Sequence, residues 1–295
     1  MEHPSLHRYA VLLAVCTLLL VAAGALVTSN EAGLSVPDWP LSYGRLMPEM
    51  TGGVLFEHGH RMVATAVGML TIGLAVWLWR VERRAWMRRL GGITLAAVIV
   101  QGLLGGMTVK FLLPPAVSVS HACLAQLFFA TTVAIAVFTS RSWQRGPEIV
   151  ADYGVPSLRT LAIAIPALVV AQIALGAAFR HRAIGLMPHI AGSMVVLLAI
   201  LLEGVFVMNQ FPTHTVLRRA AAVMLGVTAM QVFLGIAAYA ARLDAPGWVM
   251  VFTTVVHVAT GALTLASAVV LSIQIRRHVG AREAEPAQPP RAVVT

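Results

Sequence analysis

The chain has 295 residues, of which 58% are hydrophobic and 11% are charged, and its mean hydropathy is +0.82. These values are too apolar for a soluble protein of this length and indicate a polytopic membrane protein. The formal net charge of +9 therefore directs attention to how basic residues are distributed across a lipid bilayer, and not to a nucleic-acid partner.

Eight segments are long and apolar enough to cross a membrane, since a spanning helix needs about 20 mostly apolar residues. In chain order they cover 9–28, 60–79, 91–110, 118–139, 158–178, 188–208, 219–241 and 249–274. The first has an apolar run of about 19 residues, longer than that of a signal peptide, so we expect it to be retained. The sequence thus predicts an all-α membrane protein with eight transmembrane helices.

Arginines concentrate in alternate loops. The loop after the second segment carries Arg80, Arg83, Arg84, Arg88 and Arg89, and further arginines follow the fourth, sixth and eighth segments. The intervening loops hold few basic residues, so the positive-inside rule places both termini in the cytoplasm of a multi-pass cell-membrane protein. We expect the proline-rich segment 281–295 to be a disordered cytoplasmic tail.

A short pattern, Gln-x-x-Leu-Gly, occurs in the third, fifth and seventh segments. It begins at Gln101, Gln172 and Gln231, whereas the first segment has Gly24 but Leu20 in place of the glutamine. Such glycines permit close helix contact and glutamines can bond across helices, so helix packing is the simplest interpretation. The repeat also predicts two pseudo-symmetric four-helix bundles, in 1–149 and 150–280.

Four histidines are in register with this repeat, one in the outer part of each even-numbered segment. They are His60, His121, His189 and His257. At a rise of about 1.5 Å per residue, all four lie within roughly 15 Å of the outer helix ends. Imidazoles that face each other inside a four-helix bundle suit the axial positions of a haem iron. The repeat predicts two separate pairs, His60 with His121 and His189 with His257, which argues against one tetrahedral zinc site.

Neighbouring residues bear on how a haem would be held. Gly192 and Gly261 would leave room for a flat macrocycle beside the second pair. The chain has no Cys-x-x-Cys-His motif, so the haem would be bound non-covalently. Cys16 and Cys123 lie at different depths, and we expect no disulfide between them. Arg61 at the outer face would pair with haem propionates or, equally well, extend to the membrane interface.

The second segment opens on a run of ionisable residues, from Glu57 to Arg61. Such groups are costly to bury in a membrane and mark candidate functional sites. On a helical continuation, Glu57 would share a face with His60, three residues later, and the second histidine pair has no equivalent acid. This asymmetry suggests that one pair performs chemistry while the other carries electrons. The second intramembrane acid, Glu203, is expected to extend to the interface or to bond across helices.

These residues together resemble one known family. The stretch 24–28, the loop 33–40, the run 57–61, the stretch 101–108 and the four histidines are similar to heme A synthase, over essentially all eight segments. The resemblance implies an oxidoreductase that converts haem O to haem A for cytochrome oxidase, by oxidising one ring methyl to a formyl group through hydroxylated intermediates.

The resemblance also implies a division of roles. The half 1–149, with the outer loop 29–57, would bind haem O between His60 and His121, with Glu57 catalytic and Arg61 at the substrate haem. His189 and His257 would ligate haem b in the half 150–280. A haem O synthase is the partner that the resemblance suggests, and the electron acceptor is left open. Many relatives have a cysteine pair in the outer loop, but this chain has none there, so the loop must be held in another way.

Two other functions fit parts of the sequence. A bis-histidine cytochrome b that only carries electrons would use the same histidines, but it needs neither Glu57 nor the long outer loop. A transporter with inverted repeats would need no cofactor, but the repeats in this chain run parallel. Haem A in the membranes would separate the synthase from the carrier, and a colourless purified protein would favour the transporter.

Overall fold

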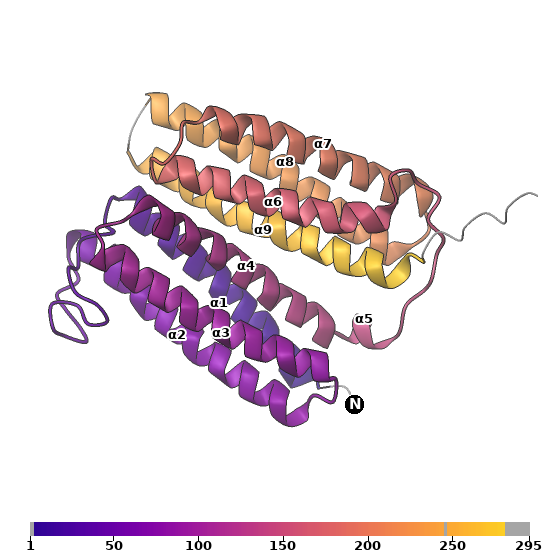
Figure 1. The fold of residues 1–295 in the computed structure, drawn as a ribbon, viewed down its shortest axis with the longest axis horizontal. Helices are drawn as coiled ribbons and strands as arrows, with labels where there is room; N and C mark the ends of the chain where they lie inside the picture. The colour runs from indigo at the N-terminus through magenta and orange to yellow at the C-terminus, as the bar shows by residue number, and fades with distance from the viewer. Residues whose placement is uncertain (1–2, 245–246, 281–295) are drawn as a thin grey trace, which may run out of the picture.

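The fold is a set of long helices joined by short connections. The structure, a computed structural model, describes residues 3–244 and 247–280 (Figure 1). The helices are α1 (Pro4–Ser29), α2 (Gly52–Val81), α3 (Ala85–Lys110), α4 (Pro115–Thr139), α5 (Arg141–Gln144), α6 (Leu158–Arg180), α7 (Met187–Gln210), α8 (Thr215–Asp244) and α9 (Trp248–His278). The predicted cytoplasmic tail, 281–295, lies outside the described residues.

All the helices except α5 are long and apolar enough to cross a membrane, which confirms the all-α class and the eight predicted spans. Helices suit this setting because hydrocarbon offers no partner to an unbonded backbone group. The largest difference from prediction is at α2, which begins at Gly52 and not near residue 60. Glu57 and His58 therefore belong to the helix, and the outer loop is shorter than the predicted 29–57.

The spanning helices pack as two four-helix bundles. In the first, α1 and α3 each contact α2 and α4; in the second, α7 contacts α6 and α8, and α9 completes the ring by contacting α6 and α8. The bundles meet where α9 packs against α1 and α4, and where α4 packs against α6 (Figure 1). Each bundle has its own buried core, with Leu74 in the first and Ile200 in the second. The predicted pseudo-symmetry of the halves stays a prediction.

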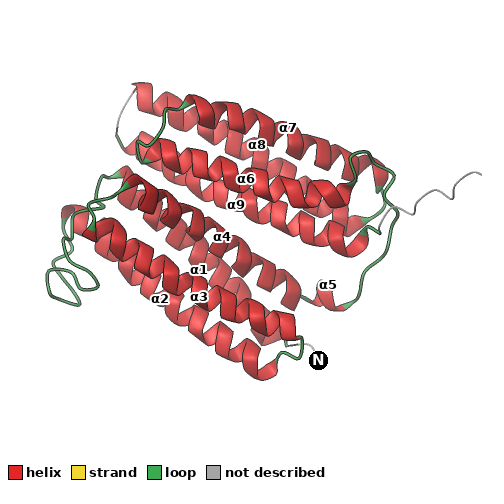
Figure 2. Cartoon of the chain, viewed as in Figure 1, coloured by secondary structure: helices red, strands yellow, loops and turns green. Residues whose placement is uncertain are grey.

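The long loop between α1 and α2 lies at one end of the molecule. The start of α1, the short helix α5 and the end of α9 lie at the opposite end (Figure 2). There the linker after α5 pairs with the end of α9: the Val150 amide donates to the His278 carbonyl (2.8 Å), and the Gly280 amide donates to the Val150 carbonyl (2.9 Å). The two ends of the described chain are thus on one side, and their cytoplasmic location stays a prediction.

Candidate functional site

The four predicted ligand histidines lie near the loop end of the molecule, on α2, α4, α7 and α9. Each ring lies against a glycine of the preceding helix: Gly24 against His60, Gly105 against His121, Gly176 against His189 and Gly235 against His257. A Cβ at these glycines would come within 3.2, 3.1, 2.9 and 3.0 Å of the respective ring. Glycine is therefore needed at all four positions for the rings to approach the neighbouring backbone.

In the second bundle the two histidine rings face each other closely. The ring centroids of His189 and His257 are 6.4 Å apart, and the ring planes are nearly perpendicular at 88°. Two imidazoles on opposite faces of one metal, each bonded at about 2 Å, have ring centres about 6 Å apart. The observed spacing therefore fits a haem iron between these two residues.

In the first bundle His60 and His121 come from α2 and α4, which face each other across α1 and α3. Both side chains are partly buried. The Nδ1 atoms of His60 and His121 are buried without a hydrogen-bond partner within the described part of the chain. Buried imidazoles with a free nitrogen suit a metal ligand, because a neutral imidazole coordinates through one nitrogen.

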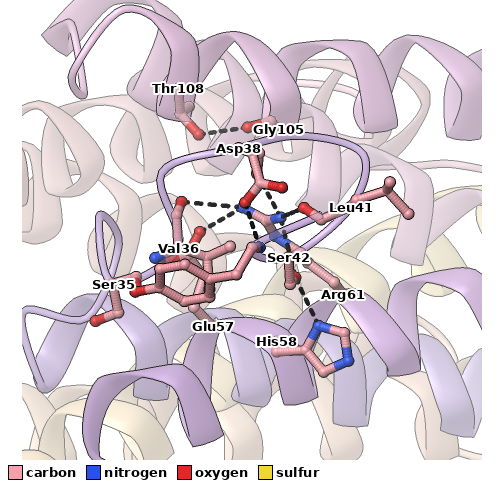
Figure 3. Close-up of polar contacts among 11 residues, drawn as sticks. Ser35, Val36, Asp38, Leu41, Ser42, Glu57, His58, Arg61, Gly105 and Thr108 are labelled. Carbon is pink, nitrogen blue, oxygen red and sulfur yellow. Dashed lines mark hydrogen bonds and ion pairs between the residues drawn. The ribbon is translucent and has the colours of Figure 1, made fainter. Parts of the chain in front are cut away.

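Glu57 lies one turn outward from His60 on α2 and is 4% exposed. Its Oε1 accepts a hydrogen bond from the Arg61 guanidinium at 2.6 Å, and its Oε2 accepts one from the Val36 amide at 2.8 Å (Figure 3). A carboxylate has about four lone-pair positions, so these two bonds leave it able to accept further hydrogen bonds or a proton. The acid is thus held in one orientation but is not saturated.

Arg61 ties the outer loop to α2. Besides its ion pair with Glu57, its Nη1 donates to the carbonyls of Asp38 and Leu41, both at 2.8 Å, and lies 3.4 Å from Ser42 Oγ (Figure 3). Guanidinium offers five donors in a fixed planar fork, which allows one side chain to bind several acceptors. The guanidinium of Arg61 thus bonds to the loop, and the predicted contact of Arg61 with a haem propionate stays a prediction.

Further contacts order the loop without any cysteine. Ser42, which is 1% exposed, shares a hydrogen bond with His58 Nδ1 at 2.8 Å. The carboxylate of Asp38 accepts from the amides of Tyr43 (2.6 Å) and Gly44 (2.8 Å), and the Gly44 bond is the main cause that lowers the pKa of Asp38. These side chains, with Arg61 and Glu57, form what we call the cap network.

Sequence reasoning missed the role of Ser42 and Asp38 in this network. The available signal was an unusual density of turn-forming and polar residues in a loop too long for a simple connection. Trp39 adds an apolar contact, because its ring lies against Gly106 of α3, where a Cβ would be 2.7 Å from Trp39 Cδ2. The loop is therefore packed on the first bundle at the end where His60 and His121 lie.

Two further expectations concern Gly192, Gly261 and Glu203. The amides of Gln172 and Gln231 lie beside Gly192 and Gly261, and the predicted room for a macrocycle there stays a prediction. Glu203 neither extends to the interface nor bonds across helices: it is 0% exposed, and both carboxyl oxygens lack a hydrogen-bond partner within 3–244 and 247–280. Cys16 and Cys123 are free thiols.

The sequence of this chain is similar to those of known proteins. A family model described as cytochrome oxidase assembly protein, COX15-CtaA, matches residues 7–53 and 49–283. The chain is 35% identical over 134 residues to heme A synthase of Shouchella clausii, covering 44% of each protein. It is 33% identical over 170 residues to heme A synthase of Symbiobacterium thermophilum, covering 56% of this chain and 55% of that protein. The chain thus spans about half the length of these curated relatives.

Proposed function

Because the chain belongs to the COX15-CtaA family of cytochrome oxidase assembly proteins, we propose that it is a heme A synthase. In this proposal it is a membrane oxidoreductase that takes haem O as substrate and oxidises one ring methyl to a formyl group through hydroxylated intermediates. The curated relatives that it resembles bear the name of that activity.

The observation that carries the proposal is the asymmetry between the two histidine pairs. Glu57 lies three residues before His60, whereas Leu186 and Thr254 occupy the equivalent places before His189 and His257. A haem that only carries electrons needs no acid beside its iron, while oxidation of a carbon–hydrogen bond releases protons that a nearby base can accept. We therefore assign haem O to the first bundle and haem b to the second.

In the first bundle His60 and His121 would hold the substrate haem. Glu57 would accept protons as the methyl group is oxidised, or orient a water at the oxidised carbon. The Arg61 guanidinium and the Val36 amide fix the orientation of this carboxylate. The packed loop would exclude bulk water from the reacting carbon.

In the second bundle His189 and His257 would hold haem b, whose iron supplies one-electron transfer when it is bound. The 6.4 Å separation of the rings supports this assignment. The protein would pass electrons from the substrate side to an acceptor outside the chain, and a haem O synthase is the partner that would deliver the substrate.

Expression in cells that make haem O but no haem A tests the activity. We expect haem A or its hydroxylated precursor in the membranes with the unaltered chain. Glu57→Gln and Glu57→Ala should keep haem binding but lose turnover. If the unaltered chain carries only haem b, and the haem O in the cells stays unconverted, the result would instead favour an electron carrier. Full turnover in both variants would remove Glu57 from the mechanism.

A further inference from the structure

The three glutamines of the repeated pattern point at the candidate haem ligands. Gln101 Nε2 donates to the His121 carbonyl at 3.0 Å and lies 3.4 Å from the His121 ring. Gln172 Nε2 donates to the His189 carbonyl at 2.8 Å and lies 2.9 Å from the His189 ring. These two glutamines therefore touch both the backbone and the ring of one histidine on the next helix, Gln101 at ring Nε2 and Gln172 at ring Nδ1.

In the described part of the chain the third glutamine contacts only the ring of its histidine. Gln231 Nε2 lies 3.5 Å from the His257 ring, and its amide lies beside Gly261. All three glutamines precede by four residues the glycine on which the same histidine ring rests, so the two side-chain positions share one helix face. The glycine and the glutamine act on one ring from the same helix.

The fourth histidine lacks this support. Leu20 stands four residues before Gly24, where the other helices have glutamine. Within the described residues no glutamine bonds to His60, and this sets it apart, because its buried, unpartnered Nδ1 is shared with His121 and His257. His60 thus keeps the glycine contact but has no side chain that fixes the rotation of its ring.

Each of the three glutamines also has an amide oxygen that accepts no hydrogen bond in the described part of the chain. The Oε1 atoms of Gln101, Gln172 and Gln231 are all buried without a hydrogen-bond partner in the described part of the chain. Buried polar atoms are rarely left unpaired unless a ligand or a change of state completes them. A metal-ligating imidazole usually donates its other N–H to an acceptor that fixes the ring and raises its basicity. In the structure the Nε2 atom of each amide faces the ring, so the amide must rotate by about 180° to present its oxygen for that bond.

We propose that Gln101, Gln172 and Gln231 are positioning residues that secure three of the four haem-ligating histidines, and that His60 is the exchangeable ligand of the substrate haem. This inference rests on the proposed function and extends it. Both ligands in the second bundle are secured, as suits a haem that stays bound. The first bundle combines a secured His121 with an unsecured His60, as suits a haem that must enter and leave.

Haem dissociation rates test the inference without relying on activity. The purified protein, which already holds haem b, is loaded with ferric haem O in the absence of an electron acceptor. An excess of a haem-scavenging apoprotein is then added, and the transfer of each haem to it is followed by absorbance. Gln172→Leu and Gln231→Leu should each speed haem b loss about 10- to 100-fold, the usual effect of removing such a partner, and should leave haem O loss unchanged. Gln126→Leu is the control, since Gln126 is buried on α4 but bonds to none of the four histidines.

The reverse substitution installs the missing support. Leu20→Gln should slow haem O dissociation about tenfold, leave haem b unchanged and sharpen the low-spin ferric signal of the substrate haem in electron paramagnetic resonance. Leu18→Gln, at a partly buried leucine on the same helix, is its control. Unchanged dissociation rates in all these variants would overturn the inference.

The outcomes separate this inference from the proposed function. A chain that binds both haems but makes no haem A would refute the synthase activity, while rate changes in the glutamine variants would still support the positioning role. A chain that makes haem A with unchanged rates would refute the positioning role alone. A purified protein without any haem would refute both.

Discussion

Arg61→Ala should release the outer loop from the first bundle while the helices stay folded. The substitution removes the ion pair with Glu57, whose side chain is 6% exposed, and the bonds to the Asp38 and Leu41 carbonyls. Removing one partner of a buried ion pair costs about 3–5 kcal/mol, because the remaining charge stays buried and uncompensated. The loop can avoid most of this cost by opening, which lets Glu57 reach water.

Amide hydrogen exchange measures that opening directly. The Val36 amide donates to Glu57 Oε2 at 2.8 Å in the closed loop, so its protection reports the cap network. A loss of about 3 kcal/mol corresponds to exchange faster by about 100-fold or more in residues 32–46, with the helix cores unchanged. Arg61→Lys should recover only part of the protection, since an ammonium cannot reproduce the planar fork.

The control is Arg45→Ala, at an exposed arginine of the same loop whose side chain makes none of the cap-network contacts. It should leave exchange within 32–46 unchanged. The reasoning would be wrong if Arg61→Ala and Arg45→Ala gave the same exchange, or if Arg61→Ala unfolded the helices together with the loop.

Three further predictions concern packing, buried charge and pH. Gly176→Ala places a Cβ 2.9 Å from the His189 ring and should cut bound haem b at least about tenfold by pigment content; Gly226→Ala, where a Cβ meets nothing within 4 Å, should not. Glu203→Met replaces an unpartnered buried carboxyl by an apolar side chain of similar size and should raise the thermal midpoint in detergent, by about 1–3 kcal/mol of stability. A lower midpoint would reveal a partner for the acid. Backbone amides lower the pKa of Asp38 below its ordinary value of 3.8. The contribution of the Asp38 carboxylate to loop order is therefore complete above pH 3.8, and it is lost as the pH falls through the lower pKa of the folded protein. Limited proteolysis of the loop should therefore rise only in strong acid, and Asp38→Asn should abolish that acid step; an unchanged step in this variant would assign it to another group.

Hydropathy predicts the spanning helices of this chain, and the register of the histidines predicts its candidate haem ligands. Apolar runs of about 20 residues identify spanning helices directly, because length and apolarity are the two requirements of the bilayer. The start of α2 was misjudged since polar residues such as Glu57 and His58 interrupt the apolar run, although they continue the helix. Helix ends depend on local bonds that hydropathy does not report.

Contacts between distant residues were not predictable in the same way. The bond from the Val36 amide to Glu57 joins residues 21 positions apart in a loop without periodicity. The glutamine repeat was visible as a pattern, but its target was not, since only the packing of successive helices brings Gln172 against the His189 ring. Glu203 shows the same limit, because sequence gives its depth in the helix but not its neighbours.

The division of roles between the two bundles is the central claim, and pigment analysis of one pair of variants tests it most directly. His121→Leu and His257→Leu are purified from cells that make haem O, and the extracted haems are separated by chromatography and identified by mass. We predict that His121→Leu retains haem b but loses haem O and haem A, and that His257→Leu loses haem b but retains haem O. Loss of the same haem from both variants would contradict the account.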